Sequence, residues 1–385
     1  MRKIHLMSLV LIVLLIFMSG PALAQTMPVF CGDLAEADCT LLKDSQTAMA
    51  GLHSGAAQLD VAVSVSNIPD SPFEQLDFGL TGDGTFAIDP ALMESMMAMQ
   101  SDPSALFSTP EAFMDWFSQF LKGFSGDLNL TLHLPAELTA MMSSEDQTIP
   151  ENLSIGLRFV DGFAYANLAS IAESMPDAGV PAGWVGIDLA TLMEQNMAQS
   201  GFGGMEGMDP EVFKSYMQSF QDPAFLSEFM TIERLADIDV MGQQAAVFQY
   251  TFDYPALFQS DVFKQMMQAQ MEAVASMSGS EMDSDAQAEM DKAMEMMGPM
   301  FEGMTLEMRQ TIGLDDKFAH STEMKMAWDM SGFMAAVEPD SEGPAPTFTF
   351  DMTVNASDFN AAPEIVAPED ATIFPIDSMV PSNDM

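Results

Sequence analysis

Alternating apolar and polar positions mark two segments near the middle of the chain, 232–240 and 246–254. In the second segment four aromatic residues occupy every other position: Phe248, Tyr250, Phe252 and Tyr254. Successive side chains of a strand point to opposite faces of a sheet, so this alternation predicts a strand with an aromatic row on one face. Residues 241–244 join the two segments and complete a predicted strand pair.

The spacing of apolar residues becomes helical after this pair. Between residues 266 and 308 they recur every three or four positions, and this segment holds twelve of the chain's 39 methionines. The pattern predicts two amphipathic helices, interrupted at Ser278-Gly279-Ser280, that pack over the aromatic row. We therefore expect a ligand-binding surface formed by the aromatic row and the apolar residues above it: Val262, Met266, Met267, Met271, Met290, Met294 and Met297.

Other alternating segments occur along the rest of the chain, at 58–66, 76–88, 127–134 and 348–354. The second of these contains Gly82-Asp83-Gly84, which predicts a turn within it. A tight hairpin is predicted at Asp161-Gly162, and a further strand pair at 305–314 and 319–329. Successive hairpins with helical insertions at about 90–122, 189–230 and 255–301 predict an α+β fold built on an antiparallel sheet.

The first residues of the chain have the order of a secretory signal peptide. Arg2 and Lys3 precede an apolar run over residues 6–17 and the small-residue pattern Pro21-Ala22-Leu23-Ala24. We expect residues 1–24 to be removed by cleavage near Ala24, with a retained N-terminal anchor as the alternative. The chain would then be exported to the periplasm, the cell envelope or the extracellular space, as a single domain over 25–376 with a flexible tail at 377–385.

The charge of the chain limits its partners. Its formal net charge is −45, and only ten of its twelve Lys and Arg residues lie beyond residue 24. Such a surface repels nucleic acid and anionic membranes at long range, so we exclude nucleic acid as a partner.

Cys31 and Cys39 are the only cysteines, and they lie eight residues apart just after the predicted cleavage site. In an exported chain this pair predicts a local disulfide. A thiol metal site is the alternative, but no histidine lies close to either cysteine.

The order of these elements is similar to that of a known family. The relevant parts are a helix at 34–52 leading into a strand at 59–65, the Asp161-Gly162 hairpin, the strand Trp184-Val185-Gly186-Ile187-Asp188, and the pair that contains residues 309–316. Together they resemble the exported LolA/LppX-like family of lipoprotein- and lipid-binding proteins. The resemblance implies a curved antiparallel sheet, an incomplete β-barrel, with helices covering its concave face. It also implies that acyl chains, lipoproteins or other amphiphiles bind in the cavity between them.

The sequence contains no recognisable catalytic motif. The histidines beyond the signal are His53, His133 and His320, and none belongs to a zinc-protease, nucleophile-elbow or phosphate-binding pattern. The acidic pair Asp315-Asp316 lacks the spacing of a calcium-binding loop and is interpreted as a solvated turn. We therefore expect no enzymatic activity, no cofactor and no resident metal.

The methionines admit two interpretations. Thioether sulfur suits copper(I), and pairs such as Met294 and Met296 are close in sequence. Methionine is also a good helix former with an adaptable side chain, useful where a surface must fit irregular apolar partners. We prefer the second interpretation because copper sites usually add histidine or cysteine, which are scarce here.

Three functions are therefore expected, in order of preference. The first is a carrier or binding protein for a hydrophobic or amphiphilic ligand, such as a lipid, an acyl chain or a lipoprotein. The second is a structural or interaction protein of the cell envelope with a filled core. The third is a methionine-rich copper(I)-binding protein. A transient contact with the envelope membrane or an envelope protein would accompany the first.

Overall fold

The computed structural model describes residues 29–68, 71–101, 110–143, 148–174, 176, 179–189, 191–192, 223–260, 262–265, 300–337 and 344–375. The predicted signal segment 1–24 and tail 377–385 lie outside the described residues. So do six of the candidate ligand-binding residues: Met266, Met267, Met271, Met290, Met294 and Met297.

Long strands dominate the described part of the chain. They are β1 Ser54–Ser66, β2 Gln75–Ile88, β3 Phe124–His133, β4 Asn152–Val160, β5 Phe163–Asn167, β6 Trp184–Asp188, β7 Met230–Arg234, β8 Ile238–Val240, β9 Gln243–Phe252, β10 Met304–Gly313, β11 Ala319–Asp329, β12 Thr347–Ser357 and β13 Thr372–Ile373. The helices are α2 Glu36–Ala50, α3 Pro90–Ser101, α5 Pro110–Gly123, α6 Ala136–Met142, α7 Ala169–Ser174, α10 Pro223–Leu226, α11 Tyr254–Gln259 and α14 Ser331–Val337.

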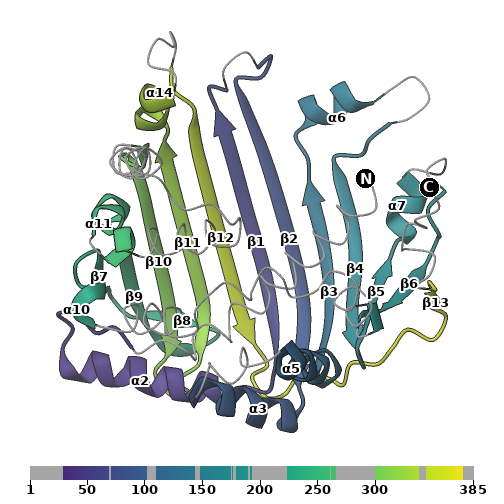
Figure 1. Ribbon diagram of the computed structural model, residues 1–385, viewed down its shortest axis with the longest axis horizontal. Coiled ribbons are helices and arrows are strands. Elements are labelled where there is room, and N and C mark those ends of the chain that lie inside the picture. Colours follow the sequence, from purple (N-terminus) through teal and green to yellow (C-terminus); the bar gives the residue numbers. More distant parts are fainter. Residues whose placement is uncertain are drawn as a thin grey trace, which may run out of the picture.

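The strands form one open sheet with the order β13-β6-β5-β4-β3-β2-β1-β12-β11-β10-β9-β7, and β8 pairs with β9 (Figure 1). All neighbours are antiparallel except β13, which runs parallel to β6. The first half of the sheet comes from β1–β6 and the second from β7–β12, and the pairing of β1 with β12 joins them. The predicted α+β fold with an open, curved antiparallel sheet is confirmed.

The register gives this sheet one apolar and one polar face. Opposite residues of adjacent strands point to the same side. One such row crosses the middle of the sheet as Leu80, Val61, Met352, Met324 and Met308. The adjacent row on the other face contains Thr81, Asp60, Thr353, Glu323 and Arg309. The two-residue alternation in the sequence therefore continues across strands that are far apart in the chain.

The turn predicted at Gly82-Asp83-Gly84 is wrong, because these residues lie inside the continuous strand β2. The glycines face the side chains of β3 on the apolar face. A Cβ added to Gly82 would lie 2.6 Å from Leu130 Cδ2 and 3.0 Å from the carbonyl oxygen of Asn129. Glycine at this position lets the neighbouring strand approach closely, which explains a glycine inside a strand without a turn. By contrast, the Asp161-Gly162 hairpin is confirmed, with φ of 54° and 83° at its two residues.

The aromatic row is one residue shorter than its pattern indicates. Phe248, Tyr250 and Phe252 lie on the apolar face of β9. Tyr254 is instead the first residue of α11, where Asp253 caps the helix by accepting a hydrogen bond from the amide of Ala256 and Pro255 occupies the first turn. Because proline in the first turn and an aspartate cap both favour a helix start, the strand ends before Tyr254.

Three helices pack at one end of the sheet, as Figure 1 shows for α2, α3 and α5. Leu41 and Leu42 of α2 belong to one core cluster with Phe248 and Ile312. Leu92 of α3 joins the α5 residues Phe120 and Leu121 in a second cluster, against Ile88 and Phe124 of the sheet. Cys31 and Cys39 are joined by a disulfide, with Cα atoms 5.3 Å apart, beside the start of α2.

The C-terminal segment returns from β12 to the far edge of the sheet and ends in β13. Arg158 of β4 holds this segment by donating from Nη1 to the carbonyl oxygen of Val366 at 3.0 Å. The same guanidinium pairs with Asp127 at 2.5 Å and lies 5.1 Å from the ring centroid of Trp184. One arginine therefore connects β3, β4 and β6 to the chain end.

Candidate ligand-binding site

The apolar face has a covered end and an open end. At the covered end Phe248 and Ile312 have no exposed surface and pack against Leu41 and Leu42 of α2. The face residues Leu59 and Leu130 are also buried, at 4% and 3% exposed. Toward the open end most face residues are half-buried and Leu132 of β3 is 37% exposed, although Leu306 of β10 is only 8% exposed. The difference arises along single strands: Leu59 is 4% exposed, whereas Val61, Val63 and Val65 of β1 are each half-buried.

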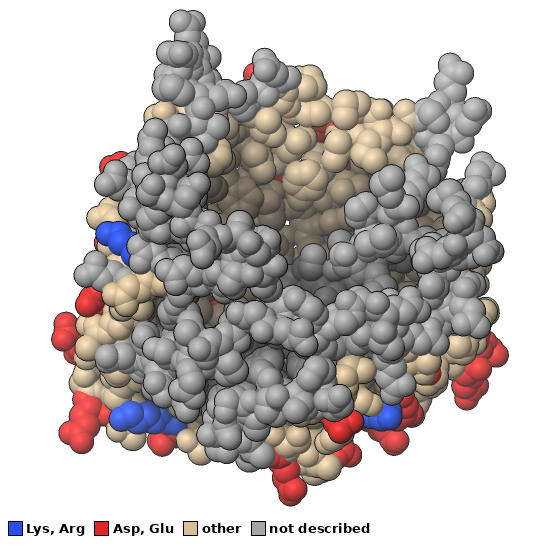
Figure 2. All heavy atoms as spheres, in the orientation of Figure 1, with Lys and Arg blue, Asp and Glu red and all other residues tan. Residues whose placement is uncertain are grey.

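Figure 2 shows a hollow over this open end, seen from the side of the helices. Its visible wall among the described residues consists mostly of uncharged atoms, while acidic side chains gather at the periphery of the molecule. Side chains from opposite halves of the sheet meet in this region. Val63 lies between Phe350 of β12 and Phe78 of β2, and Met326 of β11 pairs with Phe350. The wall of the hollow is therefore aromatic and thioether-rich.

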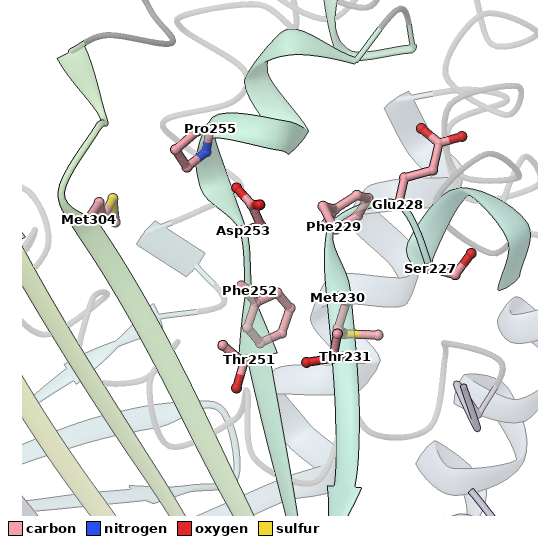
Figure 3. A pocket seen from close by; sticks show the side chains of 10 residues that line it. All are labelled: Ser227, Glu228, Phe229, Met230, Thr231, Thr251, Phe252, Asp253, Pro255 and Met304. Atoms are coloured by element: carbon pink, nitrogen blue, oxygen red, sulfur yellow. The ribbon is translucent and has the colours of Figure 1, made fainter. Parts of the chain in front are cut away.

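A smaller pocket lies at the open end beside β7, the last strand of the sheet (Figure 3). Its volume is about 340 Å³, within the lower range of small-molecule sites. Met230, Phe252 and Met304 contribute apolar atoms from three adjacent strands. The rest of its lining is Ser227, Glu228, Phe229, Thr231, Thr251, Asp253 and Pro255, so the pocket has a mixed polar and apolar wall.

The candidate residues in the described part of the chain are spread over different environments. Phe248 has no exposed surface and packs under α2, which makes it part of the closed core. Tyr250 and Val262 are half-buried beside that core. Phe252 alone of the aromatic row lines the pocket, and Tyr254 lies outside the sheet in α11.

A chain of ring contacts borders the open end. Phe258 of α11 lies 4.4 Å from Phe301, centroid to centroid, and Phe301 stacks on Trp328 of β11 at 5.4 Å. Trp328 meets Phe333 of α14 edge to face at 5.9 Å, and its Nε1 donates to the carbonyl oxygen of Met300 at 3.3 Å. At the opposite side of the open end, α6 carries Met141 and Met142, which are 61% and 56% exposed. Apolar side chains therefore stand on both sides of the hollow.

Few polar side chains interrupt the apolar face. Outside the β8–β9 hairpin, those that the register places on it in the described strands include Arg234, Tyr250, Gln310 and Thr322. Arg234 is at the covered end, where it pairs with Asp38 of α2 and with Asp237. Tyr250, Gln310 and Thr322 lie next to each other at the boundary between the covered and open ends.

Burial raises the pKa of the Tyr250 hydroxyl well above its ordinary value, because the phenolate would be desolvated. Its hydroxyl donates to Gln310 Oε1 at 3.5 Å, the long limit of a hydrogen bond. The tyrosine therefore stays neutral at any physiological pH.

A buried histidine lies at the covered end. His320 is 4% exposed, and its Nε2 lies 2.9 Å from Asp316 Oδ2, so the imidazole donates to the carboxylate. Gln243 also donates to Asp316, at 3.1 Å, and the amide of Phe318 does so at the same distance. Burial raises the pKa of Asp316, but these hydrogen bonds and the nearby histidine outweigh it, so the pKa lies below its ordinary value. Asp316 thus anchors the β10–β11 turn, while its side chain is 32% exposed.

The other two histidines have partners on the sheet surface. His133 lies 3.0 Å from Thr81 Oγ1 and 2.6 Å from Asn152 Oδ1 on the polar face, and His53 donates its amide to Asn360. Among the described residues no group of three or more His, Cys, Asp or Glu side chains could hold a metal ion. No helix in that part of the chain is long and apolar enough to cross a membrane.

Comparison with solved structures found similar chains at low sequence identity. The similar structures include LprF from Mycobacterium bovis, with 11% identity over 86% of this chain and 95% of that chain and a TM-score of 0.28. LppX from Mycobacterium tuberculosis matches with 8% identity over 85% and 97% of the two chains and a TM-score of 0.26. A LolA superfamily protein from Nitrosomonas europaea matches at 7% identity, over 83% and 89% of the two chains, with a TM-score of 0.12.

No protein-family model and no curated protein sequence matches the chain. With TM-scores this low, these likenesses add no detail to the site.

Two parts of the site were missed by the sequence-based prediction. The face positions of β10 are Met304, Leu306, Met308, Gln310 and Ile312, so a single polar residue interrupts an apolar series. That interruption is visible in the sequence, but its neighbour Thr322 is identified only by the pairing of β10 with β11. The Asp316–His320 contact was also missed, because it joins two residues four positions apart across a turn and no helical or strand periodicity in the sequence indicates it.

Proposed function

We propose that the protein is a non-enzymatic carrier or binding protein for a hydrophobic or amphiphilic ligand with an acyl chain, held against the open end of the apolar face. One observation supports this most directly. Along β1, β3 and β9 the apolar face changes from buried residues (Leu59, Leu130 and Phe248) to half-buried or exposed ones, whereas Leu306 of β10 stays 8% exposed. A filled core would bury both ends alike.

The energetics favour a ligand that is long and apolar. Burial of a methylene group stabilises a complex by about 0.8 kcal/mol, so a chain of 16 carbons could contribute on the order of 10 kcal/mol before the costs of association. The half-buried methionines Met308, Met324 and Met352 adapt to irregular apolar shapes, which suits ligands of variable chain length. The strongly acidic periphery keeps such a protein soluble and away from anionic surfaces.

Neighbouring positions of β1 offer a matched test. Val63 faces the hollow, Ala62 is exposed on the opposite face, and Leu59 lies at the covered end. Binding of the apolar fluorophore N-phenyl-1-naphthylamine would be measured for three single variants: Val63→Asn, Ala62→Asn and Leu59→Asn. We expect about a tenfold loss of affinity for Val63→Asn, since a lost apolar contact of about 1.4 kcal/mol is tenfold in affinity. Ala62→Asn should stay within about twofold, and Leu59→Asn should mainly lower the unfolding temperature.

Native mass spectrometry of the purified protein, followed by lipid extraction, would complete the test. Co-purifying lipid is the expected result. Absence of lipid together with absence of fluorophore binding by the wild type would refute the proposal and favour an envelope protein with a structural role. Tight copper(I) binding in a titration would instead favour the methionine-rich metal-binding function.

A further inference from the structure

Three polar side chains form a cluster on the otherwise apolar face, and we call Tyr250, Gln310 and Thr322 the polar spot. Gln310 and Thr322 are direct partners across β10 and β11, so their side chains leave the sheet side by side. Tyr250 is diagonal to them on β9 and reaches Gln310 with its hydroxyl. All surrounding face positions are apolar: Phe248, Met308, Ile312, Met324 and Val354.

The polar spot lies where the face of β9 and β10 changes from fully buried to half-buried residues. Along their strands, Tyr250 and Gln310 are two residues from Phe248 and Ile312, which have no exposed surface. In the other direction the neighbouring face residues are Phe252 and Met308, which are half-buried. A ligand held against these half-buried positions would cover these three side chains.

The hydrogen-bonding capacity of the polar spot is largely unused within the described residues. A glutamine side chain offers two N–H donors and an acceptor oxygen, and a threonine hydroxyl can both donate and accept. In the described part of the chain the Gln310 side chain makes one hydrogen bond, the 3.5 Å contact from Tyr250 to its Oε1. Neither its amide nitrogen nor the Thr322 hydroxyl has a partner there. A hydrocarbon placed over them would remove water from these donors and supply nothing in return.

The charges around the polar spot limit what it can bind. The one cationic side chain on this face of the described strands, Arg234, lies over the ring of Phe248 at 5.2 Å and already pairs with Asp38 and Asp237. A carboxylate or phosphate at the polar spot would be desolvated without a free counter-ion. An uncharged oxygen acceptor carries no such cost and matches the free donors of Gln310 and Thr322.

We infer that the polar spot is a subsite for an uncharged carbonyl group, the ester or amide of an acyl lipid, which accepts hydrogen bonds from Gln310 and Thr322. This inference rests on the proposed binding function and adds to it the chemical group that the polar spot selects. The acyl chain beyond the carbonyl would lie along the methionines and aromatic residues of the open end.

The test uses two probes that differ by one carbonyl, methyl dodecanoate and dodecyl methyl ether. Each displaces N-phenyl-1-naphthylamine from the full-length protein, and the ratio of their displacement constants is the readout. The wild type should prefer the ester by about tenfold, the expected effect of one or two hydrogen bonds made out of water. The double variant Gln310→Leu, Thr322→Val should lose this preference, so that the ratio of the two displacement constants is close to one.

The neighbouring substitution Met324→Leu is the matched control, because it alters the same face without changing its polarity; it should retain the preference for the ester. Circular dichroism should show that the double variant is folded, as apolar side chains fit this face. Fluorophore binding without a preference for the ester, or a preference that survives in the double variant, overturns the subsite and leaves the binding function intact. Absence of fluorophore binding by the folded wild type overturns both.

Discussion

The close approach of β2 and β3 at Gly82 leads to a quantitative prediction. An alanine Cβ at this position would lie 2.6 Å from Leu130 Cδ2, about 1 Å closer than two carbon atoms normally approach. Leu130 is 3% exposed and cannot move into solvent, and the carbonyl oxygen of Asn129 at 3.0 Å limits movement of the strand. Overpacking of this kind costs about 1–3 kcal/mol, so Gly82→Ala should destabilise the protein by about 2 kcal/mol.

A double-mutant cycle with Leu130 isolates the cause. Leu130→Ala alone should cost about 2–5 kcal/mol through the cavity that it creates. In the double variant the methyl group introduced by Gly82→Ala enters that cavity and the clash disappears. The combined loss should therefore fall short of the sum of the single losses by about 1 kcal/mol or more, well beyond the roughly 0.3–0.5 kcal/mol within which independent sites add.

Urea unfolding followed by tryptophan fluorescence provides the measurement. With an m-value of about 3 kcal/mol/M, a loss of 2 kcal/mol lowers the midpoint by about 0.7 M. Gly51→Ala is the control, because the one atom near its added Cβ is the carbonyl oxygen of Ala48 at 3.5 Å. Additive losses in the cycle, or equal midpoints for the two glycine variants, would show that Gly82 lies in a solvated turn and that β2 is not continuous.

Three further predictions concern the ends of the sheet. The pKa of Asp316 is held below its ordinary value in the folded state, so its contribution to stability is present above the unfolded pKa and is lost as the pH falls through the folded pKa. The difference in unfolding free energy between wild type and Asp316→Asn should therefore shrink in that acidic window. A difference that stays constant with pH would contradict this prediction. Replacing Cys31 and Cys39 by serine should cost about 2.5 kcal/mol, the chain-entropy value for so short a loop, and an unchanged urea midpoint would argue against the link. Arg158→Met should release the C-terminal segment. The amide of Phe374, which donates to the carbonyl oxygen of Gly186, should then exchange with deuterium faster than the amides of β1. Equal exchange rates would show that β13 is held by other contacts.

The sequence predicted most of the strands because apolar alternation and burial have the same cause. The runs at 127–134 and 348–354 lie in β3 and β12 with their apolar positions on one face. The hairpin at Asp161-Gly162 was predicted because two consecutive residues with positive φ favour an Asp-Gly pair. These signals are local, and each is complete within a few residues.

Two errors occurred where the deciding contact was distant in the chain, and a third came from a local helix start. The glycines of β2 have the composition of a turn, and only the leucines of β3 explain them. The aromatic pattern of β9 continues past the strand end, because Asp253 and Pro255 begin a helix that periodicity does not register. Gln310 and Thr322 become neighbours only through strand pairing, so no motif search along the chain could place them together.

The central position of β12 has a consequence for how the chain reaches its native state. Residues as distant as Ala56 and Ser357 must pair before the middle of the sheet exists. Until β12 is available, β1 and β11 are both unpaired edges, each beside half of a broad apolar surface. Contacts of such long range slow folding and leave intermediates prone to association. The pairing of β12 should therefore limit the folding rate of this protein. Truncation before Thr347 should yield two aggregation-prone half-sheets rather than a smaller stable domain.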